Sequence, residues 1–264
     1  MNIFWRELKA HFRSLLIWGG IVILFSVSGF AKFTGYYENP ELIEVLNSMP
    51  QALLAAFNMN AFNLTTLSGF FGVMFTFFAL LLSIAAAMWG SDIISKEERD
   101  KTVEFSLTLP VRRSRLITAK ALAALVHCVG LLLIAGGITL LNVSKYQPDR
   151  DFYRFMALGM LALFIMQLIF LAVGIFLGCA LKRHKLASSV AVSILLGTYI
   201  LSVISGLKKE WGFLKYITPF KYFDPAILMR ESALDPTFLA LSLGIVTVLI
   251  AGAYVSYARR DLYI

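Results

Sequence analysis

The chain of 264 residues is 59% hydrophobic and only 15% charged, with a mean hydropathy of +0.76. An ordinary globular chain is about 25% charged, and no single core could bury this much apolar surface, so we exclude a water-soluble domain. The formal net charge of +8 arises from 24 Lys and Arg against 16 Asp and Glu, and its distribution along the chain is informative.

Six intervals contain no Asp, Glu, Lys or Arg; they are 14–31, 45–91, 121–144, 155–181, 186–207 and 236–258. A spanning helix needs about 20 apolar residues, and a charge at its centre costs roughly 2.5 kcal/mol or more. The first part of the second interval is rich in Asn, so its span is placed at 67–91. We predict one all-α integral membrane domain, 1–264, with six transmembrane helices at 15–34, 67–91, 119–142, 155–181, 186–206 and 237–258.

The residues ahead of the first span, 1–14, have the pattern of an amphipathic helix. Aromatic and apolar side chains fall on one side and basic ones on the other; they are Phe4, Trp5, Leu8 and Phe12 against Arg6, Lys9 and Arg13. We expect an interfacial helix whose basic stripe faces anionic lipid; the alternative is a plain basic lead-in that orients the first span. The first apolar run exceeds the roughly 7–15 residues of a signal peptide, so we expect the span to be retained.

Two longer loops lie on the opposite side of the membrane, at 35–66 and 207–236. The first carries three Glu residues and a helical pattern, which predicts a small helical cap. The second is dense in aromatic residues and broken by prolines, which predicts a re-entrant or surface-lying helix pair at the outer leaflet or, alternatively, a generic aromatic belt. Its aromatic residues are Trp211, Phe213, Tyr216, Phe220 and Phe223.

The long loop between the second and third spans, 92–118, has the pattern of a short helix. Ser95 and Glu98 fit a capping box, and Pro110 ends the helical pattern. Apolar residues repeat at helical spacing between them, in the pairs Val103/Leu107 and Phe105/Leu109. Such a helix could seat in a groove of a soluble partner or could lie on the bilayer.

Basic residues predict the orientation. The side holding both termini, the 91–120 segment and the 182–185 turn carries 15 Lys and Arg, against nine on the other side. Cytoplasmic segments keep an excess of Lys and Arg, so both termini are expected in the cytoplasm. Topology and anionic lipid account for this charge, and a basic chain alone is no nucleic-acid footprint, so no nucleic-acid partner is expected.

The stretch from MPQALLAAF at residue 49 to KAL at 120 resembles the permease subunits of ATP-binding-cassette transporters of the type-2 exporter class. The matching positions of their acidic, Thr-containing and L-P-V-x-R pattern are Glu97, Glu98, Thr102, Glu104, Leu109, Pro110, Val111, Arg113 and Lys120. One departure is Asp100-Lys101, where the family often has Arg-Gly, which affects the local turn. Six spans and a final Arg-Arg-Asp-Leu extend the resemblance over nearly the whole chain.

The resemblance implies a dimer of permeases, identical or not, each docked on a separate ABC ATPase subunit that binds ATP and Mg. It assigns coupling to the segment from Thr102 to Pro110, with Glu97, Glu98 and Arg113 as polar neighbours, and it implies a bacterial inner membrane. The chain has no GxxxxGK[ST] motif, so we expect no ATPase activity and no cofactor in this chain itself.

The spans favour a hydrophobic or amphiphilic cargo, such as a drug, an antimicrobial peptide or a lipid-like molecule. Their charge-free intervals weigh against proton-coupled transport, which usually needs ionisable residues in the membrane. His127 and Gln167 are typical of helix–helix hydrogen bonds, and Gly174 and Gly178 of close helix packing.

Other activities find little support in the sequence. Neither the three His residues nor Cys128 and Cys179 have metal-ligand spacing, and HExxH and GxSxG motifs are absent. The alternative to a permease is a membrane scaffold without transport activity or a membrane enzyme with an unrecognised site.

Overall fold

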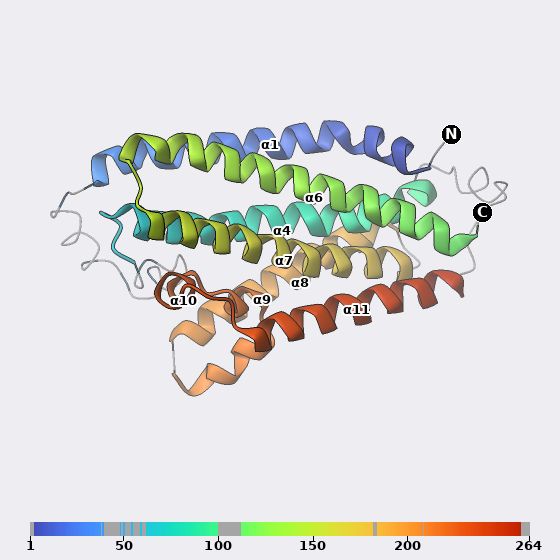
Figure 1. Ribbon diagram of the computed structural model, residues 1–264. Helices are drawn as coiled ribbons and strands as arrows, with labels where there is room; N and C mark the ends of the chain where they lie inside the picture. The colour runs from blue at the N-terminus through green and yellow to red at the C-terminus, as the bar shows by residue number, and fades with distance from the viewer. Residues whose placement is uncertain are drawn as a thin grey trace.

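The computed structural model describes residues 3–37, 62–99, 112–181, 184–207 and 209–259, with the single positions 39, 48, 50, 54 and 59. These residues form helices and connections, without a strand (Figure 1). The six long helices are α1 (Ile3–Tyr36), α4 (Leu67–Arg99), α6 (Arg113–Val143), α7 (Arg150–Ala180), α8 (His184–Leu207) and α11 (Pro236–Ala258). Each is long and apolar enough to cross a membrane, which confirms the predicted all-α fold with six spans.

Proline and aspartate positions explain where several helices begin. No proline lies inside a long helix, and Pro236 occupies the first turn of α11, where a missing N–H costs nothing. The Asp149 carboxylate caps α7 by accepting from the Phe152 amide at 2.8 Å, and Asp235 caps α11 by accepting from the Thr237 amide at 2.8 Å. Uninterrupted apolar sequence then extends both helices through the bilayer.

The predicted interfacial helix at 1–14 is not a separate element. α1 runs without a break from Ile3 to Tyr36, so these residues form the first turns of the first spanning helix. The sequence around Arg13 contains neither Gly nor Pro, and the helical hydrogen bonds therefore continue across the start of the charge-free interval.

The segment between α8 and α11 folds into three short helices instead of the expected pair: η3 (Lys209–Tyr216), α9 (Pro219–Tyr222) and α10 (Pro225–Glu231). The Tyr222 hydroxyl donates to the Tyr216 carbonyl oxygen at 2.6 Å, and its ring stacks on Phe238 of α11 with centroids 5.1 Å apart. Burial raises the pKa of Tyr222 above its usual value. Most of the other predicted outer loop, 35–66, lies outside the described residues.

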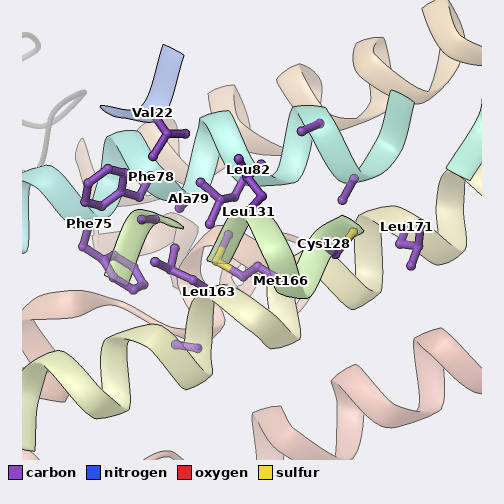
Figure 2. Packing of buried hydrophobic residues seen from close by; sticks show 14 of the residues in the cluster. Val22, Phe75, Phe78, Ala79, Leu82, Cys128, Leu131, Leu163, Met166 and Leu171 are labelled. Atoms are coloured by element: carbon purple, nitrogen blue, oxygen red, sulfur yellow. The ribbon is translucent and has the colours of Figure 1, made fainter. Parts of the chain in front are cut away.

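The long helices form three layers, with α4 and α7 in the middle, α1 and α6 on one side, and α8 and α11 on the other (Figure 1). α4 is the most enclosed helix. In its apolar stretch, 72% of the residues are buried, against 17% in the apolar stretches of α8 and of α11. Figure 2 shows apolar side chains from α1, α4, α6 and α7 meeting in the core. Those labelled are Val22, Phe75, Phe78, Ala79, Leu82, Cys128, Leu131, Leu163, Met166 and Leu171.

Several helices are longer than a bilayer requires. α1 has 34 residues and α4 has 33, and at 1.5 Å per residue each measures about 50 Å, against about 30 Å of hydrocarbon. The charged residues of these two helices and of α6 fall mainly at the end of the bundle where both chain termini lie, which we call the terminal end (Figure 1). The opposite end, which carries α10, is called the distal end.

Candidate functional site

The predicted coupling segment is bounded by two helices at the terminal end. α4 ends at Arg99 and α6 begins at Arg113. α4 runs through Ser95 to Arg99, so the capping box predicted at Ser95 and Glu98 is wrong; the Ser95 hydroxyl donates to the Ser91 carbonyl oxygen of the same helix at 2.6 Å. Glu97 and Glu98 belong to the last turn of α4, where only the backbone is described. The other residues assigned to ATPase coupling lie outside the described residues; they are Thr102, Val103, Glu104, Phe105, Leu107, Leu109 and Pro110. The structure thus defines the two helix ends that hold this segment.

Arg113 binds the end of α11. Its guanidinium donates to the carbonyl oxygens of Tyr257 and Ala258, each at 3.3 Å. Carbonyls in the last turn of a helix lack intrahelical partners, and the helix dipole favours a cation there. The hydroxyls of Thr118 and Tyr254 lie 2.7 Å apart and join the same two helices. The start of α6 is therefore fixed to the end of α11.

Lys120, which the resemblance matches to the lysine opening the third span, is buried between α6 and α4. Its side chain is 2% exposed, and its Nζ donates to the Ile93 carbonyl oxygen at 2.7 Å. A buried ammonium is costly unless it is hydrogen-bonded, and a charge-assisted bond to a carbonyl offsets part of that cost. This bond connects α6 to α4 close to the point where α4 leads into the coupling segment.

Glycines bring α4 and α7 into backbone contact. A Cβ atom added to Gly90 would lie 2.5 Å from the Leu171 carbonyl oxygen, and one added to Gly174 would overlap the Ala87 carbonyl oxygen. One added to Gly178 would meet backbone and side-chain atoms of α4 at 3.0 Å. The prediction that Gly174 and Gly178 mark close helix packing is confirmed.

Two hydrogen bonds join the same part of α4 to its other neighbours. The Trp89 indole donates to Ser14 Oγ of α1 at 2.8 Å, and Ser91 Oγ lies 2.8 Å from Ser188 Oγ of α8. Residues 89–93 of α4, which we call the α4 junction, therefore contact α1, α6, α7 and α8. A displacement of α4 at this level would be passed to all four helices.

Sequence reasoning missed a buried polar cluster on α1. Glu7 and His11 are 3% and 6% exposed, and Glu7 Oε2 lies 3.9 Å from His11 Nε2. Arg6 Nη2 donates to Glu7 Oε1 at 3.0 Å. The His127 ring lies 6.3 Å from the His11 ring and 5.6 Å from the Trp89 ring, centroid to centroid. The cluster therefore fills the contact between α1, α4 and α6 beside the α4 junction.

The face of α1 that turns inward differs from the predicted apolar face. Trp5 and Phe12 are 56% and 52% exposed, and Lys9 and Arg13 are exposed as well. Phe4 and Arg6 are half-buried. Glu7 and His11, one helical turn apart, occupy the inward face, and this spacing was the signal that could have found them.

The two polar residues predicted to form helix–helix hydrogen bonds, His127 and Gln167, differ in the structure. Both ring nitrogens of His127 are buried without a hydrogen-bond partner among the described residues, so the structure does not show the predicted bond for His127. Gln167 Nε2 donates to the Cys128 carbonyl oxygen at 3.2 Å, which confirms the predicted helix–helix hydrogen bond for Gln167. Cys128 and Cys179 are both buried, and they are not joined in a disulfide. Within the described ranges, no group of three His, Cys, Asp or Glu side chains is placed to hold a metal ion.

The aromatic residues predicted for the outer leaflet divide into two groups. Phe223 is 1% exposed, and the Phe220 ring packs 5.5 Å from the ring of Phe170 in α7, so both face the protein. Trp211, Phe213 and Tyr216 are the exposed group. Contact of this second group with lipid stays a prediction.

A small pocket lies at the distal end, where α9 and the start of α10 meet α4, α7 and α8. Phe75, Met166 and Phe220 contribute apolar surface to its lining. Lys221 and Asp224 also line it and form an ion pair, with 3.0 Å between Nζ and Oδ2. The pocket thus combines apolar surface with a charged pair.

Comparison with known proteins extends these observations. The family model of the ABC-2 family transporter proteins matches residues 1–262. No curated protein matches the chain.

Proposed function

The chain belongs to the ABC-2 family of transporter proteins, and from this premise we propose that it is the membrane-spanning permease subunit of an ATP-driven exporter. Its six apolar helices make it a multi-pass membrane protein, as the family requires. A separate ABC ATPase subunit binds ATP and Mg and supplies the energy, and the permease is not itself an enzyme. It forms the translocation path together with a second permease subunit.

The position of α4 supports ATP-driven coupling through the segment after it. α4 is the central helix and leads directly into the predicted coupling helix at residues 102–110. The α4 junction joins it to four neighbours by a buried lysine, glycine contacts and two side-chain hydrogen bonds. A force applied by the ATPase at Arg99 therefore reaches the whole bundle, and this is the observation that carries the proposal.

The exposed helix faces support a second permease subunit and a lipid environment. In the apolar stretches of α8 and α11, only 17% of the residues are buried within one chain, and in that of α1 only 22% are. Large apolar side chains such as Leu24 of α1 and Val248 of α11 are each 70% exposed. Lipid and the second subunit cover this surface.

Charge supports the proposed orientation and cargo. The terminal end carries most of the basic residues, which supports the proposal that both termini lie on the cytoplasmic side of a bacterial inner membrane. The charge-free intervals of the spans favour a hydrophobic or amphiphilic cargo over an ion.

The coupling assignment is tested by a charge substitution in the predicted coupling helix. We expect Phe105→Glu to leave membrane insertion intact and to reduce the co-purifying ATPase about tenfold or more, because a carboxylate would be buried in the partner's groove. Phe213→Glu is the matched control, since Phe213 is 62% exposed in η3, away from the coupling segment. Equal ATPase recovery from Phe105→Glu, Phe213→Glu and the unmodified chain would contradict the coupling assignment.

A further inference from the structure

The pocket at the distal end is amphipathic. Phe75 and Ala79 lie one turn apart on α4 and, with Met166 of α7, give the pocket an apolar wall. Lys221 and Asp224, in and after α9, also line it, with 25% and 14% of their side chains exposed. The charged pair is thus partly shielded from water. Because water screens charges, this shielding strengthens the interaction of the pair with a ligand.

The charges of the pair are not equally available. Both carboxylate oxygens of Asp224 are engaged, because Oδ1 accepts from the Ala226 amide and Oδ2 from Lys221 Nζ, each at 3.0 Å. The Lys221 ammonium has three donor hydrogens, and within the described part of the chain Asp224 is its one hydrogen-bond partner. The ammonium therefore retains donors for a further acceptor.

The surroundings of the ammonium leave room for that acceptor. A Cβ atom added to Gly206 of α8 would lie 3.8 Å from Lys221 Nζ, so the missing side chain keeps the space beside the ammonium open. Besides the charged pair, the lining contains three residues with hydroxyl groups: Thr76, Tyr199 and Ser202. Among the described residues, Asp224 is the one carboxylate of the lining, and it is already engaged, so the pocket favours an anion.

We propose that this pocket binds the anionic head of an amphiphile, a phosphate or a carboxylate. Lys221 holds the head, and the apolar part of the ligand lies against Val203 and Phe220, the half-buried apolar residues of the lining. The same head chemistry belongs to an exported amphiphile and to a phospholipid of the distal leaflet. The site itself does not depend on the proposed transport function; its assignment to cargo does.

The test uses two photoreactive probes with the same dodecyl tail, one carrying a phosphate head and the other a trimethylammonium head. The purified full chain in neutral detergent is labelled, and the labelled peptides are mapped by mass spectrometry. The phosphate probe is expected to label peptides containing Val203 or Phe220, and Lys221→Gln is expected to reduce this labelling about tenfold or more. Lys221→Arg keeps a cation and should retain the labelling.

Two controls separate binding from folding. Lys215→Gln removes a neighbouring lysine outside the pocket lining and should leave the labelling unchanged. The double variant Lys221→Gln, Asp224→Asn removes both charges, so it leaves no unpaired carboxylate that would destabilise the fold. The introduced asparagine can still cap α10. The double variant should lose labelling to the same extent as Lys221→Gln alone. Equal labelling by the two probes, or unchanged labelling in both charge-removing variants, would overturn the proposal.

Repeating the labelling in the reconstituted complex with ATP distinguishes the two sources. Labelling that falls during ATP turnover identifies the ligand as cargo, and labelling that persists identifies a bound lipid; both outcomes support the site. If no ATPase joins the chain but the pocket is still labelled in a Lys221-dependent way, the proposed function fails and the site stands.

Discussion

Substitution of Gly174 by alanine tests the backbone contact between α4 and α7. The added Cβ would overlap the Ala87 carbonyl oxygen and would lie 2.9 Å from the Ser91 nitrogen and 3.1 Å from the Gly90 Cα. All three are backbone atoms, which cannot rotate away, so the two central helices must separate. Overpacking of this kind costs about 3 kcal/mol, and the better helix propensity of alanine returns about 1 kcal/mol. We expect a net loss of about 2 kcal/mol of folding free energy.

The two buried cysteines provide the assay for Gly174→Ala. Cys128 and Cys179 are each 0% exposed, so a thiol-reactive dye reports thermal unfolding of the detergent-solubilised chain. A loss of about 2 kcal/mol corresponds to a fall in Tm on the order of 4–8 °C. Gly137→Ala in α6 is the control, because its added Cβ has nothing within 4 Å and should not lower Tm. If both variants melt at the same temperature, the account of the α4–α7 contact is wrong.

Two further substitutions are measured with the same dye. Lys120→Glu places a carboxylate beside the Ile93 carbonyl oxygen and should cost about 3–5 kcal/mol. Lys120→Met removes the cation and its bond to Ile93 but brings in no repelling charge, so it should cost about 1–2 kcal/mol; equal costs would contradict the buried bond. Asp149→Ala removes the cap of α7 and should cost about 1 kcal/mol, or roughly 2–4 °C in Tm. Asp151→Ala, in the first turn of α7 and not its cap, should cost about half as much, and a reversed order would refute the capping assignment.

The number and order of the long helices could be predicted from the sequence. A charged side chain inside the bilayer is costly, so the charged residues lie between the spans and leave each span as a charge-free interval. The second span is predicted to start at Leu67 because the earlier part of its charge-free interval is rich in Asn, and α4 begins at Leu67. The prediction of a separate helix at 1–14 was wrong. The boundary of a charge-free interval indicates where the hydrocarbon begins, but it does not indicate where a helix begins or ends. Nothing near Arg13 breaks the backbone hydrogen bonds, and α1 continues.

The site residues were less predictable because their contacts come from other helices. The inward face of α1 is set by His127 and Trp89, which lie far away in the sequence. Lys120 was singled out by resemblance alone, since a lysine at a span end ordinarily reaches the interface and here it binds Ile93 instead. The close packing at Gly174 and Gly178 of α7 could be predicted because two glycines four residues apart lie on the same face of a helix.

The distal pocket left no such signature. Phe75, Met166 and Lys221 come from three separate elements, and their meeting depends on how α9 folds back against α4 and α7. The aromatic pattern of the segment between α8 and α11 indicated only that it would lie near a membrane surface. Which of its aromatic side chains turn inward, such as Phe223, depends on that same tertiary contact.

We have proposed that this chain works with a separate ATPase docked at the end of α4. The most direct test is to solubilise the tagged chain from its native membranes in mild detergent and to identify co-purifying proteins by mass spectrometry. We expect a nucleotide-binding ABC subunit in nearly equal amount. Its absence, under conditions that keep other transporter complexes intact, would contradict the account and favour a membrane scaffold or an enzyme.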